Sequence, residues 1–397
     1  MSTRPRSQRR KYGLTSKRVE QLSPSGIRRF FDLLASMEEV ISLGVGEPDF
    51  VTPWHIREAA IYSLEKGYTM YTSNLGMPEL RQELSRYLRD NYELGYNPDS
   101  ELLITVGVSE GLDLAMRAIV NTGDEVIMPD PCYVSYSPCV ILAGGTPIMV
   151  PTSEENNFEI SAADIEARVT SKTKAILIGN PANPTGAVIP KDKLLPIADI
   201  ARRHKLLVIC DEIYAKLIYG VEHTCLATLP EMKESTILLS GFSKAYAMTG
   251  WRIGYAAASA EVIASMTKIH QYTMMCAPIM VQVAAIEALK SGDASVAEMV
   301  EEYNQRRLII VQGLNNIGLS CFEPRGAFYA FPSIKSTGMT SEEFAENLLI
   351  EEKVAVVPGT AFGQCGEGYV RCCYATSLAD IEEALSRMKR FVDRHKK

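Results

Sequence analysis

The sequence predicts an α/β fold with a large domain, built on a mostly parallel central sheet flanked by helices, and a smaller α+β domain. The chain has 397 residues, 46% of them hydrophobic, which is enough to bury a large core and to form two domains. From about residue 100, short apolar runs alternate with longer segments of helical periodicity, as in sheets whose parallel strands are joined by helices. This alternation ends near 291–293, where a long amphipathic segment predicts a helix that leads into a mixed α+β region.

Seven apolar runs are the predicted strands of the large domain. They are 102–106, 125–128, 148–150, 174–178, 206–210, 236–240 and 253–257. The clearest helix follows the first run, because Ser109 is placed to cap it, apolar residues recur at helical spacing from Leu112 to Val120, and Gly123 can end it. The segment 44–52 is predicted to be a crossing loop.

We therefore predict three parts of the chain. They are 1–45 (an N-terminal arm and part of the small domain), 46–290 (the large domain) and 291–397 (the small C-terminal domain).

Composition argues against several classes of function. The net charge of −7 would not steer the protein to nucleic acid or to an anionic membrane, and no apolar run approaches the roughly 20 residues that cross a bilayer. The nine cysteines and five histidines show no ligand spacing, which argues against disulfides and a metal site. The basic stretch from Arg4 to Lys11 is interpreted as a solvated arm. We expect a soluble, cytoplasmic protein without a metal.

Chemically active side chains follow four of the predicted strands. In an open parallel sheet the loops after the strands meet at one edge, where ligands bind. These loops are 107–110 at a helix start, 179–186 around Asn183, 211–214 and 241–244, with Arg252 shortly after. Taken singly, each can be a capped helix, a turn or a surface lysine. Together they bring a carboxylate, a phenol, an amide, a lysine and an arginine to a helix start that suits a phosphate.

The segment 240–255, SGFSKAYAMTGWRIGY, resembles the pyridoxal-phosphate attachment motif of the class I aminotransferases of fold type I. The resemblance continues in order along nearly the whole chain, through 46–50 (GEPDF), Tyr71 ahead of Gly76, 183–186 (NPTG), 211–214 (DEIY), 324–329 (PRGAFY) and 357–359 (VPG). It implies that the cofactor is pyridoxal 5'-phosphate and that the protein moves amino groups between L-amino acids and 2-oxo acids. It also implies a symmetric homodimer with shared active sites.

The resemblance assigns a role to each residue that would contact the cofactor. Lys244 would form the Schiff base and act as the base, Asp211 would pair with the ring nitrogen, and Tyr133 would stack on the ring, where many relatives have tryptophan. Asn183 and Tyr214 would bind the ring hydroxyl oxygen. The phosphate would be held by Arg252, Ser243, the backbone amides of Val108, Ser109 and Glu110, and Tyr71 of the neighbouring subunit.

Two positions leave the phosphate and substrate contacts open. Position 241 is glycine where relatives often have serine, so the hydroxyl donor is either Ser243 or Ser240. For the substrate, the resemblance implies that Arg371 grips the α-carboxylate. The other implied substrate contacts are Gly46, Asn183, Tyr133 and Ile27. Phe328 and Tyr329 are interpreted as core of the small domain rather than as part of the site.

The resemblance is strongest to aspartate, aromatic and acyl-diaminopimelate aminotransferases, so the predicted donor is one of these amino acids. Two alternatives remain. A pyridoxal-phosphate β-lyase or decarboxylase can share Lys244, Asp211 and Arg371 and differ only in how the carbanion collapses. A non-catalytic, ligand-binding relative is the second, although no helix-turn-helix extension accompanies the chain.

Overall fold

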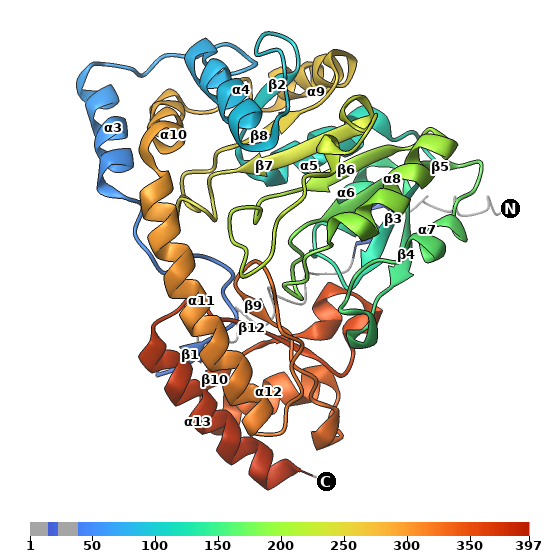
Figure 1. Ribbon diagram of the computed structural model, residues 1–397, viewed down its shortest axis with the longest axis vertical. Helices are drawn as coiled ribbons and strands as arrows, with labels where there is room; N and C mark the ends of the chain where they lie inside the picture. The colour runs from blue at the N-terminus through green and yellow to red at the C-terminus, as the bar shows by residue number, and fades with distance from the viewer. Residues whose placement is uncertain (1–14, 23–38, 397) are drawn as a thin grey trace, which may run out of the picture.

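The computed structural model describes residues 15–22 and 39–396, and in it the seven predicted strands form one sheet (Figure 1). The strands are β2 (Leu102–Thr105), β3 (Glu125–Asp130), β4 (Thr146–Pro151), β5 (Thr173–Gly179), β6 (Leu207–Asp211), β7 (Thr236–Gly241) and β8 (Gly254–Ala257). Their order is β2-β8-β7-β6-β5-β3-β4. Strand β8 runs antiparallel to the other six strands of this sheet, which share one direction, so the predicted fold class, with its mostly parallel sheet, is confirmed.

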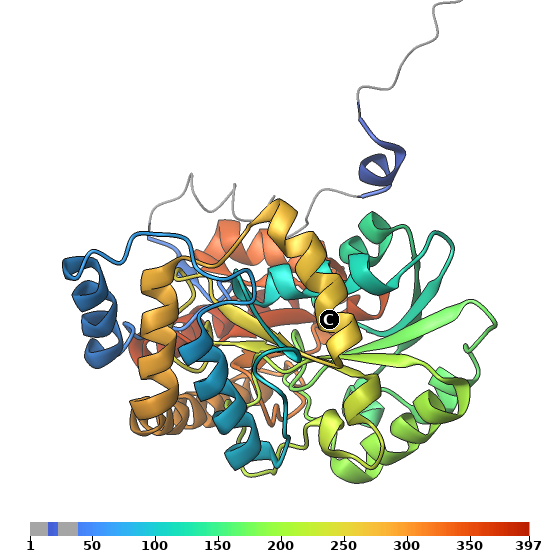
Figure 2. The same ribbon diagram turned by 90° about the horizontal axis from the view of Figure 1, so that it is seen from above.

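Helices cover both faces of this sheet, because successive side chains of each strand point to opposite faces (Figure 2). Leu102 packs into the core on one face, and Leu103 packs into the core on the other. The helices on the Leu103 face are α5 (Gly107–Ile119), α6 (Tyr136–Ala143) and α9 (Ala260–Thr273). Those on the opposite face are α3 (Trp54–Glu65), α4 (Pro78–Tyr92), α7 (Ala162–Glu166), α8 (Lys191–His204) and α10 (Ile279–Ser291).

Helix α5 begins before the residue predicted to cap it. Ser109 lies in the first turn of α5, and the N-cap is Val106, which has no capping side-chain bond of its own. The carboxylate of Glu110 instead accepts the Val106 N–H at 2.5 Å and satisfies one of the free donors at this helix end. The prediction that Ser109 caps this helix was therefore wrong. The side chain of Glu110 reaches back from the first turn and accepts the Val106 N–H instead.

The C-terminal part of the chain has its own small sheet, β11-β12-β9, which is antiparallel throughout. The predicted amphipathic helix near residue 293 is confirmed as α11, which runs from the central sheet to the C-terminal part (Figure 1). The elements are α11 (Asp293–Asn316), β9 (Tyr329–Ala330), α12 (Ser341–Glu352), β10 (Val354–Ala355), β11 (Val357–Pro358), β12 (Val370–Cys373) and α13 (Leu378–His395).

Short elements complete the described chain. They are α1 (Lys17–Glu20), β1 (Ile41–Ser42), and the 3₁₀ helices η1 (Glu154–Asn156), η2 (Leu226–Thr228), η3 (Lys233–Ser235), η4 (Lys335–Thr337), η5 (Gly359–Phe362) and η6 (Gln364–Gly366). Strand β1 pairs in parallel with β10, so the segment just before residue 46 packs with the C-terminal part. This pairing supports our proposal that the small domain includes residues from both ends of the chain.

Some predictions fall on parts of the chain without described coordinates. The basic arm from Arg4 to Lys11 and Ile27 both lie outside the described residues. Within the ranges that the structure does describe, none of the helices has the length and apolar character needed to traverse a bilayer.

Candidate active site

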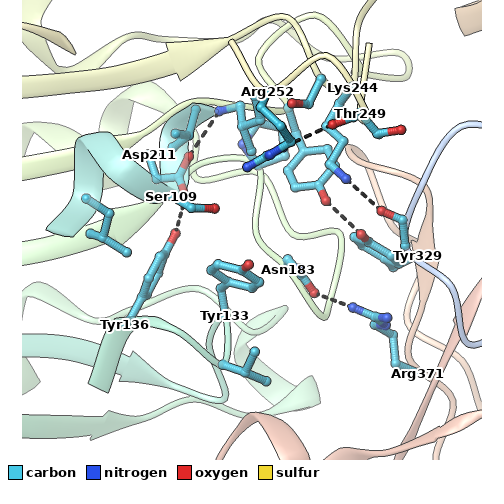
Figure 3. Close-up of a pocket in the computed structure, with 18 of the residues that line it drawn as sticks. Ser109, Tyr133, Tyr136, Asn183, Asp211, Lys244, Thr249, Arg252, Tyr329 and Arg371 are labelled. Atoms are coloured by element: carbon cyan, nitrogen blue, oxygen red, sulfur yellow. Dashed lines mark hydrogen bonds between the residues drawn. The ribbon is translucent and has the colours of Figure 1, made fainter. Parts of the chain in front are cut away.

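A cavity of about 400 Å³ lies at the carboxyl edge of the central sheet (Figure 3). Its walls come from the segments after β2, β3, β5, β6 and β7, from the crossing loop at Gly44 and Gly46, and from the C-terminal residues Tyr329 and Arg371. The four loops singled out in the sequence therefore meet as predicted. Among the predicted site residues, those that line the cavity are Gly46, Val108, Ser109, Tyr133, Asn183, Asp211, Tyr214, Ser243, Lys244, Arg252 and Arg371.

Lys244 reaches from the end of β7 across the cavity to the crossing loop. Its Nζ donates a hydrogen bond of 2.7 Å to the carbonyl oxygen of Gly46. Burial is the main cause that lowers the pKa of Lys244 to about 8; the Cys373 thiol opposes this shift, and the guanidinium of Arg371 adds to it. About a tenth of this amine is therefore neutral at pH 7, and this neutral form is the one that acts as a nucleophile or base.

Asp211 ends β6 as a buried carboxylate. The hydroxyl of Tyr136 donates to its Oδ2 at 2.9 Å, and the N–H of Ile213 donates to its Oδ1 at 3.2 Å. Burial raises the pKa of Asp211 to about 6, against the opposing effect of these two hydrogen bonds. Among the described residues no cationic side chain forms an ion pair with this carboxylate, so the site suits a ligand that brings a positive charge.

Tyr136 is a site residue that the sequence did not reveal. It begins α6 and lines the cavity beside Asp211, and its ring meets the ring of Tyr133 edge to face at 5.6 Å. A Cβ at Gly179 would lie 2.6 Å from the Tyr136 hydroxyl, so glycine at that position leaves room for the phenol. The spacing of Tyr133 and Tyr136 was a visible signal, but nothing in one sequence pairs Tyr136 with a carboxylate 75 residues away.

One end of the cavity combines a helix start with a guanidinium. Val108 and Ser109 of the first turn of α5 lie there with Arg252 and Ser243. Gly107 has a φ of +76°, and a Cβ on it would lie 2.6 Å from Nη2 of Arg252, so the helix start and the guanidinium are close neighbours. Free N–H groups and a guanidinium together suit an anion such as a phosphate.

Gly241 has a structural reason to lack a side chain. A Cβ at this position would lie 2.8 Å from the Cα of Gly254, the first residue of the neighbouring strand β8, and 3.0 Å from the carbonyl oxygen of Ile253 just before it. Ser240 donates its hydroxyl to the carbonyl oxygen of Glu212 at 3.0 Å and does not line the cavity, whereas Ser243 does. Of the two serines left open by the sequence, the geometry favours Ser243.

Arg371 lies at the opposite end of the cavity, 4% exposed. Its Nη1 donates to Oδ1 of Asn183 at 3.0 Å, and its Nη2 donates to the carbonyl oxygen of Gly44 at 2.8 Å. Its Nε is buried without a hydrogen-bond partner, and no carboxylate of the described chain pairs with this guanidinium. A buried, unpaired guanidinium at a cavity wall is suited to a ligand carboxylate.

Tyr329 belongs to the site, and its assignment to the core alone was wrong. Its hydroxyl is 2.6 Å from the hydroxyl of Tyr214, and the Cζ of Arg371 lies 4.4 Å from its ring centroid. It is buried, as predicted, but it lines the cavity. Phe328, in contrast, packs in the main core and does not line the cavity, so its interpretation as core was correct.

Two further predicted residues do not line this cavity. The Glu110 carboxylate turns to the Val106 N–H and to Nδ1 of the buried His270, at 2.7 Å, and the predicted contact of its backbone amide stays a prediction. Tyr71 is 78% exposed on the surface of the molecule. That position is compatible with a contact to a second subunit rather than to its own cavity.

Comparison with known proteins identifies relatives along nearly the whole chain. The sequence model of a family described as aminotransferase class I and II matches residues 38–388. The YugH protein of Bacillus subtilis, named only provisionally as an aminotransferase, is 60% identical over 94% of this chain and 97% of its own length. An aspartate aminotransferase of Pyrococcus abyssi is 47% identical over 94% of this chain and 97% of its own. A solved structure of an aromatic aminotransferase from Pyrococcus horikoshii, 44% identical, covers 92% of this chain and 99% of that one with a TM-score of 0.88.

Proposed function

The chain belongs to the class I and II aminotransferase family, and we propose that it moves an amino group from an L-amino acid to a 2-oxo acid such as 2-oxoglutarate. It would do so by a ping-pong mechanism, with pyridoxal 5'-phosphate attached to Lys244 as a Schiff base. The observation that carries this proposal is the placement of a buried lysine, with its pKa lowered to about 8, in the same cavity as an unpaired buried carboxylate and an unpaired buried arginine.

The residues of the cavity fit this cofactor. Asp211, without a cationic partner in the described chain, would hold a protonated ring nitrogen. The start of α5, with Arg252 and Ser243, would hold the phosphate, Tyr133 would pack on the ring, and Tyr214 with Asn183 would bind the ring hydroxyl oxygen. When bound, the cofactor supplies an electron sink that stabilises the carbanion formed at the substrate α-carbon.

The protein side chains would divide the remaining work. Arg371 would bind the substrate α-carboxylate by a two-pronged ion pair and so orient the α-carbon, with Asn183 and Gly44 fixing the guanidinium. The amine of Lys244, once free, would take the proton from the substrate α-carbon. It would then deliver this proton to the cofactor carbon that bears the transferred nitrogen. Its lowered pKa keeps part of it unprotonated and able to accept that proton.

The proposed donors are aspartate, aromatic amino acids or an acyl-diaminopimelate. Relatives of this chain carry the names aspartate aminotransferase, aromatic-amino-acid aminotransferase and probable N-acetyl-LL-diaminopimelate aminotransferase. Two aromatic residues, Tyr329 and Tyr133, line the cavity with Arg371, and the rings of Tyr329 and Phe362 pack on its guanidinium. Such a wall supports an aromatic donor as well as an acidic one.

We also propose that the enzyme is a cytoplasmic homodimer in which Tyr71 reaches the phosphate site of the partner subunit. In support, Tyr71 is one of a group of exposed large apolar side chains on α3, on the following loop and at the end of α9. The group comprises Trp54, Ile61, Tyr62, Leu64, Tyr68, Met70, Tyr71, Tyr272, Met274 and Met275. An exposed apolar group of this kind is typical of a surface that another protein covers.

A single experiment tests the reaction class and the donor together. The cofactor-loaded enzyme is titrated with one amino acid at a time while its visible absorbance is followed. Loss of that absorbance with aspartate, tyrosine, phenylalanine or an acyl-diaminopimelate, and its return with 2-oxoglutarate, is the expected result. Release of pyruvate and ammonia without consumption of a 2-oxo acid would instead identify a β-lyase, and no response to any amino acid would favour a binding protein.

A further inference from the structure

We propose that Tyr329 is a positioning residue that joins the two ends of the site, because its hydroxyl holds the hydroxyl of Tyr214 while its ring face holds the guanidinium of Arg371. The inference rests on the proposed function, since Tyr214 and Arg371 matter as ligands of the cofactor and the substrate.

The hydroxyl of Tyr329 is placed to orient that of Tyr214. The two oxygen atoms are 2.6 Å apart, and both phenols are buried, with exposed fractions of 1% and 5%. If Tyr329 donates, the hydrogen of the Tyr214 hydroxyl is free to point into the cavity. Hydrogen bonds aligned in this way strengthen one another, so Tyr329 would make Tyr214 a better donor to an oxygen bound there.

The ring of Tyr329 contacts Arg371 because of the register of the small sheet. Tyr329 on β9 lies opposite Cys373 on β12, and Arg371 is two residues from Cys373, so both side chains emerge on the same face. The Cζ of Arg371 lies 4.4 Å from the Tyr329 ring centroid and 4.8 Å from that of Phe362. A guanidinium held against two rings is restricted in orientation and remains free to use its edge for a carboxylate.

Tyr329 also supports the loop on which Lys244 rests. A Cβ on Gly46 would lie 2.5 Å from the Tyr329 hydroxyl oxygen, so the backbone of the crossing loop packs directly on the phenol. The carbonyl oxygen of that same Gly46 accepts the hydrogen bond from Lys244. The Tyr329 side chain therefore contacts Tyr214, Arg371 and Gly46, which are the proposed ligands of the ring oxygen and the substrate carboxylate and the residue that accepts the bond from Lys244. Figure 3 shows Tyr329 between Lys244 and Arg371.

The chain provides a matched control for these contacts. Tyr219 is also buried, its hydroxyl donates to the carbonyl oxygen of Ala327 at 2.5 Å, and the Cζ of Arg307 lies 5.3 Å from its ring centroid. Tyr219 does not line the cavity. A Tyr219→Phe variant thus removes a buried, hydrogen-bonded hydroxyl beside an arginine, and it removes no side-chain atom that lines the cavity.

The test measures the contribution of the Tyr329 hydroxyl and that of its ring separately. Tyr329→Phe, Tyr329→Met and Tyr219→Phe are compared with the unmodified protein. The affinity of each apoprotein for pyridoxal 5'-phosphate is measured by quenching of protein fluorescence, and its affinity for 3-phenylpropanoate, a carboxylate without an amino group, by calorimetric titration. Circular dichroism verifies the fold, and Tyr329→Leu replaces Tyr329→Met if the latter does not fold.

Tyr329→Phe is expected to weaken cofactor binding about fivefold, the equivalent of one hydrogen bond, and to leave carboxylate affinity within about twofold. Tyr329→Met is expected to weaken carboxylate binding about tenfold as well, because the guanidinium loses a ring face. Tyr219→Phe should match the unmodified protein in both measurements. Cofactor affinity unchanged in Tyr329→Phe, or carboxylate affinity unchanged in Tyr329→Met, would overturn the inference. If the unmodified enzyme fails to transaminate, the proposed function falls, while these apoprotein affinities still decide the role of Tyr329.

Discussion

Asp211 and Lys244 carry pKa shifts of opposite sign for the same physical reason. Burial disfavours the charged form of each, which raises the pKa of the carboxyl to about 6 and lowers that of the amine to about 8. Both groups are therefore close to the point where they change charge near neutral pH. Asp211 is therefore suited to a ligand that brings a positive charge, and Lys244 is suited to a ligand that reacts with its neutral amine.

The shift of Asp211 predicts a pH-dependent cost to the apoprotein. Since the pKa in the folded state lies above the unfolded value of about 3.9, the ionised carboxylate destabilises the fold. This cost is absent below about pH 3, grows as the pH rises through the two pKa values and is complete above about pH 7. Asp211→Asn should thus raise the free energy of unfolding of the apoprotein by about 2–3 kcal/mol at pH 7.5, while turnover is lost.

Urea unfolding of both apoproteins checks this prediction. The advantage of Asp211→Asn should increase by about 1 kcal/mol between pH 5 and pH 7.5. Asp199→Asn is the control with the opposite sign, because hydrogen bonds from Arg203 lower the pKa of the exposed Asp199. An advantage of Asp211→Asn that does not depend on pH would show that the carboxylate is not the source of the cost.

The shift of Lys244 predicts its reactivity. In the apoprotein, labelling of the amine by trace acetic anhydride should rise as the pH increases from 6 to 8 and level off above about pH 9, because only the neutral amine reacts. Mass spectrometry of the peptide that contains Lys244 measures the labelled fraction. Nα-acetyl-lysine amide, with a pKa near the ordinary value of about 10.4, is the reference. A Lys244 profile that coincides with this reference would contradict a lowered pKa.

At the scale of elements, the close approach of β7 and β8 explains why position 241 is glycine, where relatives often have serine. Gly241 faces Gly254 across an antiparallel pair, where two glycines let the backbones and the start of α5 come together. The position that often carries a phosphate-binding serine in relatives has no room for a side chain here, so in the proposed function Ser243 and the backbone would bind the phosphate instead.

Gly241→Ser should therefore destabilise the protein rather than restore a phosphate contact. The new Cβ would lie 2.8 Å from the Cα of Gly254, and displacing a backbone in a packed sheet costs about 1–3 kcal/mol. Guanidinium unfolding measures the loss. Gly250→Ala is the matched control, because a Cβ there meets no atom within 4 Å. Equal stability of Gly241→Ser and the unmodified protein would show that β8 can move aside.

At the scale of the whole molecule, the exposed position of Tyr71 predicts active sites shared between subunits. If Tyr71 serves the partner's site, Lys244→Ala and Tyr71→Ala dimers should each be nearly inactive. Hybrids formed after mixing and subunit exchange contain one site with both native residues. A mixture at equal concentrations should regain about a quarter of the unmodified activity, since half the dimers are hybrids with one intact site each.

Sedimentation provides the independent measurement for this prediction. The protein should sediment as a species of twice 43.8 kDa. No recovery of activity in a mixture shown by sedimentation to be dimeric would place Tyr71 outside the partner's site.

The sequence by itself determined the sheet and the residues that end its strands. The seven apolar runs became the seven strands, and Asp211 and Lys244 entered the cavity as predicted, because strand periodicity and strand-end position are local properties that a short segment encodes. The shared edge of the loops follows from the parallel topology alone.

Only the tertiary structure decided the contacts between distant segments. Tyr136 reaches Asp211 from α6, and Tyr329 meets both Tyr214 and Arg371. Each contact depends on how layers pack or on the register of β9 against β12, which long-range packing fixes and no local pattern records. A buried tyrosine has the same sequence signature in a core as in an active site, so the difference lies in which side chains the fold places against it.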